Sequence, residues 1–191
     1  MIEIGGTALS LLLCGVGGIF VGFIDSIAGG GGLVSLPMLL AMGLPPNLAI
    51  GTNKLAAACG NIVSSVQFIR AGKTKLSLAW RMIPLALAGP GAGTFMVIVF
   101  AMVGFDFVVA AGNAKILAVG TNCTSLLLFI MWDQILYEYA VVLAAGLMIG
   151  AYFGSRTAIR RGAPFIRFVM MVVTIALIGK LLLEYGQAYL L

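Results

Sequence analysis

Two lysines interrupt long apolar segments of this chain. Lys54 lies within Leu48–Ile69 and Lys115 lies within Val108–Trp132, and both segments are long enough to cross a membrane as helices. A lysine near the centre of such a helix costs at least about 2.5–3.5 kcal/mol on insertion scales, so it is usually retained for a use. Each ammonium could attract an anion or pair with a carboxylate. Alternatively, each side chain could extend to the membrane surface without any such use.

Side-chain amides accompany both lysines. Asn61 and Asn122 each follow their lysine by seven residues, which places lysine and amide on nearly the same helical face. Asn53 and Asn113 precede the two lysines by one and two residues, respectively. Amide groups provide donors for the oxygen atoms of an anion, so the two sets could line one cavity. The alternative for each amide is an interhelical hydrogen bond that only stabilises the bundle.

Glycine-rich segments precede both lysine-containing segments. Glycine allows a helix to break and the backbone to approach a ligand closely. The half-helix that follows then directs free N–H groups at an anion. Gly29–Gly32 lacks the lysine and hydroxyl residues that end a nucleotide-binding loop. The glycines whose amides we expect to bind the anion are Gly30, Gly31, Gly32, Gly91 and Gly93.

The composition places these residues in a membrane protein. Of 191 residues, 62% are hydrophobic and 9% are charged, whereas soluble domains contain about a quarter charged residues. The apolar segments lack the alternating pattern of barrel strands, so we expect helices. The net charge of +5 comes mainly from basic residues at the segment ends, which favours membrane orientation over nucleic-acid binding. Without histidine, a nucleophile–base pair or a metal-ligand cluster, we expect neither a cofactor nor an enzyme; a membrane enzyme is the weaker alternative.

The chain contains an internal repeat. At an offset of 61 residues, segment 28–72 aligns with segment 89–133 without a gap. The alignment pairs Lys54 with Lys115 and Asn61 with Asn122, which chance does not readily produce in an apolar chain. The alternative is that two unrelated segments both need glycine for helix packing.

Asp25 stands just before the first glycine-rich segment. Its carboxylate could take up a proton and couple it to transport, or it could neutralise Lys54. Capping of a helix end is the structural alternative. The repeat aligns this position with Ala86, so the carboxylate is not duplicated and any coupling role would be asymmetric.

Charges between the segments predict the orientation of the repeats. Basic residues follow the first long segment (Arg70, Lys73, Lys75), whereas acidic residues follow the second (Asp133, Glu138). Basic loops face the cytoplasm, so the repeats should have opposite orientations. We therefore predict an all-α, polytopic membrane protein with two inverted repeats containing glycine-rich broken or re-entrant helices, an architecture of many secondary transporters. Residues 1–191 form a single transmembrane domain, in which spans 139–153 and 165–183 follow the repeats.

Long motifs in both halves resemble the TauE/SafE family of sulfite exporters. In the first half they are Gly22–Pro37, Gly43–Pro46 and Ala49–Lys54. In the second half they are Gly89–Gly93, Gly104–Phe107, Ala114–Lys115, Gly150–Arg156 and Arg160–Ala163. The motifs are long and specific, and together they extend over most of the chain.

The resemblance implies a permease of the inner (plasma) membrane for sulfite, sulfonates or related sulfur-containing and organic anions. The paired glycine-rich and Asn-Lys regions would form its central site. The implied partners are a small anion and the lipid bilayer, without nucleic acid, and a homo-oligomer is compatible with this prediction. Family members are usually longer, and a middle portion is missing here around Ala88–Gly89. The alternative function is therefore a non-transporting membrane subunit or assembly partner.

Overall fold

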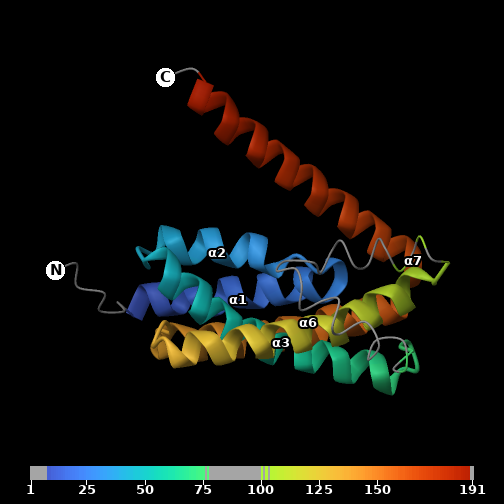
Figure 1. The fold of residues 1–191 in the computed structure, drawn as a ribbon. Helices are drawn as coiled ribbons and strands as arrows, with labels where there is room; N and C mark the ends of the chain where they lie inside the picture. Colours follow the sequence, from blue (N-terminus) through green and yellow to red (C-terminus); the bar gives the residue numbers. More distant parts are fainter. Residues whose placement is uncertain (1–7, 76, 78–99, 101, 103, 190–191) are drawn as a thin grey trace.

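The computed structural model describes residues 8–75, 77, 100, 102 and 104–189, and these residues contain helices without strands. The helices are α1 (Ala8–Ala28), α2 (Gly31–Ala41), α3 (Pro46–Arg70), α6 (Phe107–Met131) and α7 (Tyr137–Tyr189). Figure 1 shows α1, α3, α6 and the first part of α7 side by side as a bundle, with the last part of α7 leaving it at an angle. The prediction of an all-α, polytopic membrane protein is confirmed.

Three of the helices are long and apolar enough to cross a membrane by length and composition, namely Ala8–Ala28, Phe107–Met131 and Tyr137–Ala176. Large apolar side chains remain exposed on them, such as Leu9, Leu127 and Phe168. Such a surface suits a lipid environment, because lipid does not exclude apolar side chains as water does.

Glycines allow α1 and α7 to pack closely. A Cβ atom on Gly22 would overlap the backbone of Leu147, and one on Gly150 would lie 2.7 Å from the backbone nitrogen of Phe23. Gly18 and Gly22 of α1, and Gly146 and Gly150 of α7, are four residues apart, a spacing that lets two helix backbones approach closely. The α1–α7 contact forms one side of the bundle (Figure 1).

The first glycine-rich segment separates α1 from α2. Gly29 has a φ of 72°, which favours glycine because a Cβ atom is strained in this left-handed region. Helix α2 then begins at Gly31 and has only 11 residues. Its length of about 16 Å is roughly half of the hydrocarbon thickness, as expected for a broken helix.

Helices α3 and α6 begin and end at positions related by the 61-residue offset. The turn before each contains a glycine with positive φ, Gly43 at 87° and Gly104 at 93°. The turn after each also has a residue with positive φ, Gly72 at 66° and Asp133 at 52°. The two segments thus have equivalent local backbone structure. Residues 78–99, where the second repeat begins, lie outside the described residues.

Helix α7 differs from the two predicted spans, 139–153 and 165–183. It is helical throughout its 53 residues except at Gly162, where φ is 73° and ψ is −165°. Arg156, Arg160 and Arg161 lie between the two predicted spans, where a loop was expected, but all three are helical. Arginine and alanine are good helix formers, so the break is limited to Gly162.

Basic residues from distant segments gather at one end of the bundle. Lys75 lies over the ring of Phe105 at 4.9 Å, and Arg167 lies over that of Phe107 at 4.4 Å. This is the end at which α3 and the first part of α7 finish and α6 begins (Figure 1). The acidic turn with Asp133 lies at the opposite end, where α6 finishes.

Candidate functional site

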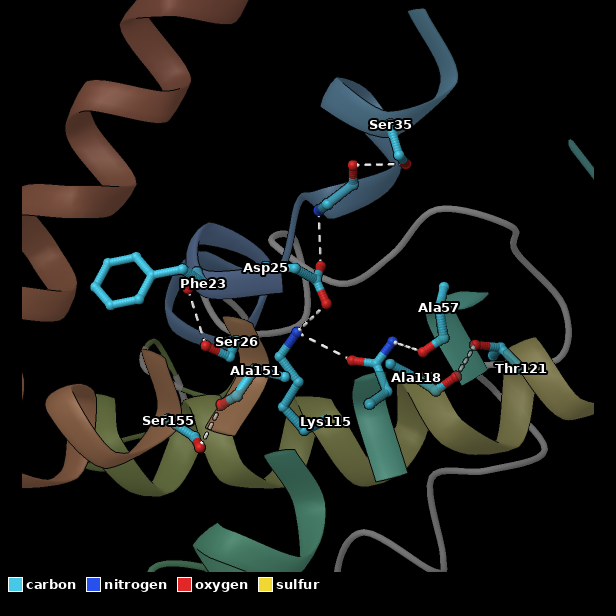
Figure 2. A network of polar contacts seen from close by, with 12 residues as sticks. Phe23, Asp25, Ser26, Ser35, Ala57, Lys115, Ala118, Thr121, Ala151 and Ser155 are labelled. Atoms are coloured by element: carbon cyan, nitrogen blue, oxygen red, sulfur yellow. Dashed lines mark hydrogen bonds and ion pairs between the residues drawn. The ribbon is translucent and has the colours of Figure 1, made fainter. Parts of the chain in front are cut away.

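The Lys115 ammonium is the centre of a buried polar network. Its Nζ atom donates to Asp25 Oδ2 at 2.8 Å and to Asn61 Oδ1 at 3.1 Å. Only 3% of the Lys115 side chain and 14% of the Asp25 side chain are exposed. Figure 2 shows the lysine side chain reaching from α6 toward Asp25 near the end of α1. Helices α1, α3 and α6 therefore meet at one ammonium group.

The break between α1 and α2 completes the surroundings of Asp25. A carboxylate in the last turn of a helix faces the negative end of the helix dipole. Here it also accepts a hydrogen bond of 2.7 Å from the backbone N–H of Gly31, at the positive end of α2. A Cβ atom on Gly31 would lie 2.6 Å from the Asp25 Cβ, so glycine is needed for this contact. Asp25 thus caps α2 and balances Lys115.

Of the alternatives considered for Asp25, capping of a helix end agrees with this arrangement, whereas neutralisation of Lys54 does not, because the carboxylate pairs with Lys115. Helices α1 and α3 run in the same direction (Figure 1), so Asp25 near the end of α1 lies beside the second half of α3. Lys115 reaches that level, where it contacts Asn61, whereas Lys54 lies in the first half of α3. The backbone N–H of Gly31, which we expected to bind the anion, donates instead to the Asp25 carboxylate.

Lys54 takes part in an equivalent contact on the other side of the α3–α6 crossing. Its Nζ atom donates to Asn122 Oδ1 at 3.3 Å, just as Lys115 donates to Asn61 Oδ1 at 3.1 Å. The two lysines and the two asparagines are pairs at the 61-residue offset. Because residue 54 meets 122 and residue 61 meets 115, α3 and α6 run antiparallel.

The loops that follow α3 and α6 make an equivalent pair of contacts. Thr52 Oγ1 accepts a hydrogen bond from the backbone N–H of Leu136 at 3.0 Å. Asn113 Oδ1 accepts one from the backbone N–H of Lys75 at 2.8 Å. Thr52 is equivalent to Asn113, and Lys75 is equivalent to Leu136. Each helix therefore binds the loop that follows the other helix.

Two glycines make room for these loops. A Cβ atom on Gly51 would overlap the carbonyl oxygen of Gln134, and one on Gly112 would overlap that of Lys73. Both the glycines and their neighbours are again pairs at the same offset. Mutual contacts of this kind, in which i meets j and j meets i, characterise a two-fold axis.

The remaining predicted residues are distributed as follows. Asn53 is buried and accepts a hydrogen bond of 2.6 Å from Ser35 of α2, and a Cβ atom on Gly32 would lie 3.6 Å from its Nδ2 atom. Gly30 is the residue that precedes α2. The Nδ2 atom of Asn113 is buried and has no hydrogen-bond partner among the described residues. Gly91 and Gly93 lie outside the described residues.

Sequence reasoning missed the role of Ser35. It considered only Lys54 as an ionic partner of Asp25, whereas the partner is Lys115. The 61-residue offset could have revealed the mutual contacts, because an antiparallel crossing of two equivalent helices pairs each lysine with the other asparagine. No cluster of three His, Cys, Asp or Glu residues suited to a metal ion occurs in the part of the chain that the structure describes.

Comparison with known proteins agrees with the resemblance of the motifs. The model of the family described as "Sulfite exporter TauE/SafE" matches residues 14–90 and 85–181. The chain belongs to this family. The TauE/SafE match covers the lysine helices, the glycine-rich break and most of α7, so the protein is a membrane transporter of this family.

Curated relatives extend over the same TauE/SafE region. The "Probable membrane transporter protein" of Haemophilus influenzae is 27% identical over 252 positions, which cover 96% of this chain and 98% of that protein. The "Probable membrane transporter protein YfcA" of Escherichia coli K12 is 29% identical over 238 positions, with 88% of each chain covered. "Probable membrane transporter protein ORF9" of a Sinorhizobium species is 26% identical over 237 positions. No solved structure matches the chain.

The alignments are longer than the chain itself. The Haemophilus influenzae alignment has 252 positions, whereas this chain has 191 residues. The relative therefore contains residues without a counterpart here. The two family matches meet at residues 85–90, next to the predicted gap at Ala88–Gly89.

Proposed function

We propose that this TauE/SafE transporter moves a small sulfur-containing or organic oxyanion, such as sulfite or a sulfonate, across the cell's inner (plasma) membrane. The supporting observation is the α3–α6 crossing, where two lysines lie within the bundle and each contacts an asparagine of the other helix. Lysine within a membrane bundle attracts an anion where water cannot screen it. The substrate class comes from the family, and the position of the site comes from the α3–α6 crossing.

Alternating access is the proposed mechanism. Inverted repeats can exchange conformations around a shared central site, which opens it first to one side of the membrane and then to the other. The mutual contacts of α3 and α6 support a two-fold axis between Lys54 and Lys115. The lysines are seven residues from the facing asparagines, so their ammonium groups are separated by about 10 Å along the bundle. They would lie at similar distances on either side of the membrane centre.

The proposed topology is multi-pass, with the basic end of the bundle in the cytoplasm. Both Lys75 and Arg167 lie at that end, and basic residues are retained on the cytoplasmic side during insertion. The acidic turn after α6 would then face outward. This orientation gives an anion an outward route from the basic side through the α3–α6 crossing.

Uptake of radiolabelled sulfite into liposomes that contain the purified 191-residue chain tests this proposal. The control is Lys54→Met/Asp25→Asn/Lys115→Met, which removes all charges of the α3–α6 crossing without leaving one unpaired. We expect saturable flux with the natural chain and none above empty liposomes with the control. Flux that is equal in both proteins, or absent from both, contradicts anion transport by this chain through these residues.

A further inference from the structure

We infer that the two lysines have different roles: Lys54 binds the transported anion, whereas Lys115 is held by Asp25 and binds no substrate. This inference rests on the proposed anion transport. The repeat makes the two lysines equivalent in sequence, and their contacts with asparagine are equivalent in structure. The difference between them is the carboxylate.

The charge of Lys115 is already balanced. Its ammonium lies 2.8 Å from the Asp25 carboxylate and is 3% exposed. An anion that approached Lys115 would have to displace a carboxylate that is also held by the Gly31 amide at 2.7 Å. The Asp25 carboxylate, with both oxygens held, outcompetes a dilute diffusible anion for Lys115, because a group of the same chain is always present at high effective concentration.

The charge of Lys54 has no such partner in the described part of the chain. Its hydrogen bond goes to the neutral Asn122 at 3.3 Å, and Asp25–Lys115 is the ion pair found there. The other carboxylates whose side chains the structure describes stand at helix ends: Asp106 caps α6, Asp133 follows α6, and Glu138 lies in the first turn of α7. One uncompensated positive charge therefore remains at the crossing.

The surroundings of Asp25 indicate what kind of ligand Lys54 would take. At the equivalent position, a group with two oxygens on one carbon accepts from an ammonium through one oxygen and from a backbone N–H through the other. A diffusible anion with at least two oxygens on one centre could occupy the corresponding place beside Lys54. Carboxylates, sulfonates and sulfite share this chemistry, and a single lysine balances one negative charge.

Anion binding by the purified full chain in detergent separates the two lysines. Isothermal titration with sulfite, methanesulfonate and acetate, with chloride as the ionic-strength control, gives the affinity of each protein and distinguishes the oxyanion classes. We expect Lys54→Met to bind about tenfold more weakly or worse, since it loses a charge-assisted hydrogen bond. The matched variant Asp25→Asn/Lys115→Met removes one lysine without changing the net charge, and it should retain the natural affinity.

A second variant addresses the case in which Lys54→Met does not fold. Asn122→Asp places a carboxylate where the amide oxygen now lies 3.3 Å from Lys54, so it should form an internal ion pair and prevent anion binding in a folded protein. Loss of binding in folded Asp25→Asn/Lys115→Met, or natural affinity in Asn122→Asp, overturns the assignment of Lys54. If the natural chain binds no oxyanion better than chloride, the proposed function itself is wrong.

Discussion

A buried ion pair is sensitive to the loss of either partner. The Asp25 carboxylate and the Lys115 ammonium are largely withdrawn from solvent, and separating them would leave one charge without compensation in an apolar bundle. Replacing both partners by neutral side chains is far less disruptive than replacing one. The pair is therefore best studied through single and double variants together.

We predict that Lys115→Met lowers the free energy of unfolding by about 3 kcal/mol, because it leaves Asp25 buried without its counter-ion. Asp25→Asn/Lys115→Met should regain most of this loss, since the asparagine oxygen can still accept from the Gly31 amide. Reversible unfolding of the detergent-solubilised chain by SDS, followed by circular dichroism, measures both. A single variant as stable as the natural chain would show that the ion pair does not stabilise the fold.

At the scale of elements, Asn113 attaches α6 to the loop after α3. Its Oδ1 atom accepts from Lys75, while its buried Nδ2 atom has no partner in the described part of the chain. Thr52 performs the same task at the equivalent position of α3 with a hydroxyl alone. These contacts indicate that only the oxygen acceptor of Asn113 is needed to bind the loop after α3.

We predict that Asn113→Thr is more stable than Asn113→Ala by about 1 kcal/mol, the net contribution of one hydrogen bond. Threonine can retain the acceptor for the Lys75 amide and removes the unpartnered Nδ2 atom. The same unfolding measurement compares the two variants. If alanine is as well tolerated as threonine, the contact with the loop contributes nothing measurable.

Packing of α1 against α7 predicts a second difference between elements. Gly150→Ala should lower the free energy of unfolding by about 1–3 kcal/mol, the usual range for overpacking, because the new methyl group meets the backbone of Ile19 and Phe23. Gly179→Ala is the control in the same helix, where a Cβ atom would meet nothing within 4 Å. The control should unfold no earlier than the natural chain. Equal loss in both variants would indicate an effect of helix flexibility rather than of close packing.

At the scale of the whole molecule, the sidedness of the bundle is testable. In a background without the native cysteines, we predict that Glu138→Cys reacts with a membrane-impermeant maleimide added to intact cells. Arg160→Cys should react only after the cells are opened, because basic ends stay in the cytoplasm. Both natural side chains are exposed, so lack of labelling is not caused by burial in the bundle. The reverse pattern would place the basic end outside.

The sequence predicted the helices well because their causes are local. Long apolar segments, the glycines at 29–32 and the 61-residue repeat are all visible in the amino-acid order. The partner of Asp25 was not predictable in that way, since two lysines were available and the correct one lies 90 residues away. Which lysine pairs with Asp25 depends on the packing of α6, which runs antiparallel to α3 and so brings Lys115 next to the end of α1. The end of the first part of α7 was also missed, because helix-forming arginines continue to Gly162.

Gly162 also determines how many times the chain can cross a bilayer. A straight helix with the 53 residues of α7 would be about 80 Å long, more than twice the hydrocarbon thickness of about 30 Å. The left-handed conformation at Gly162 divides it into two rods, each about 40 Å long and each sufficient for one crossing. Under the proposed multi-pass topology, this single residue allows α7 to cross the membrane twice, so that the second rod ends on the face from which the first one started.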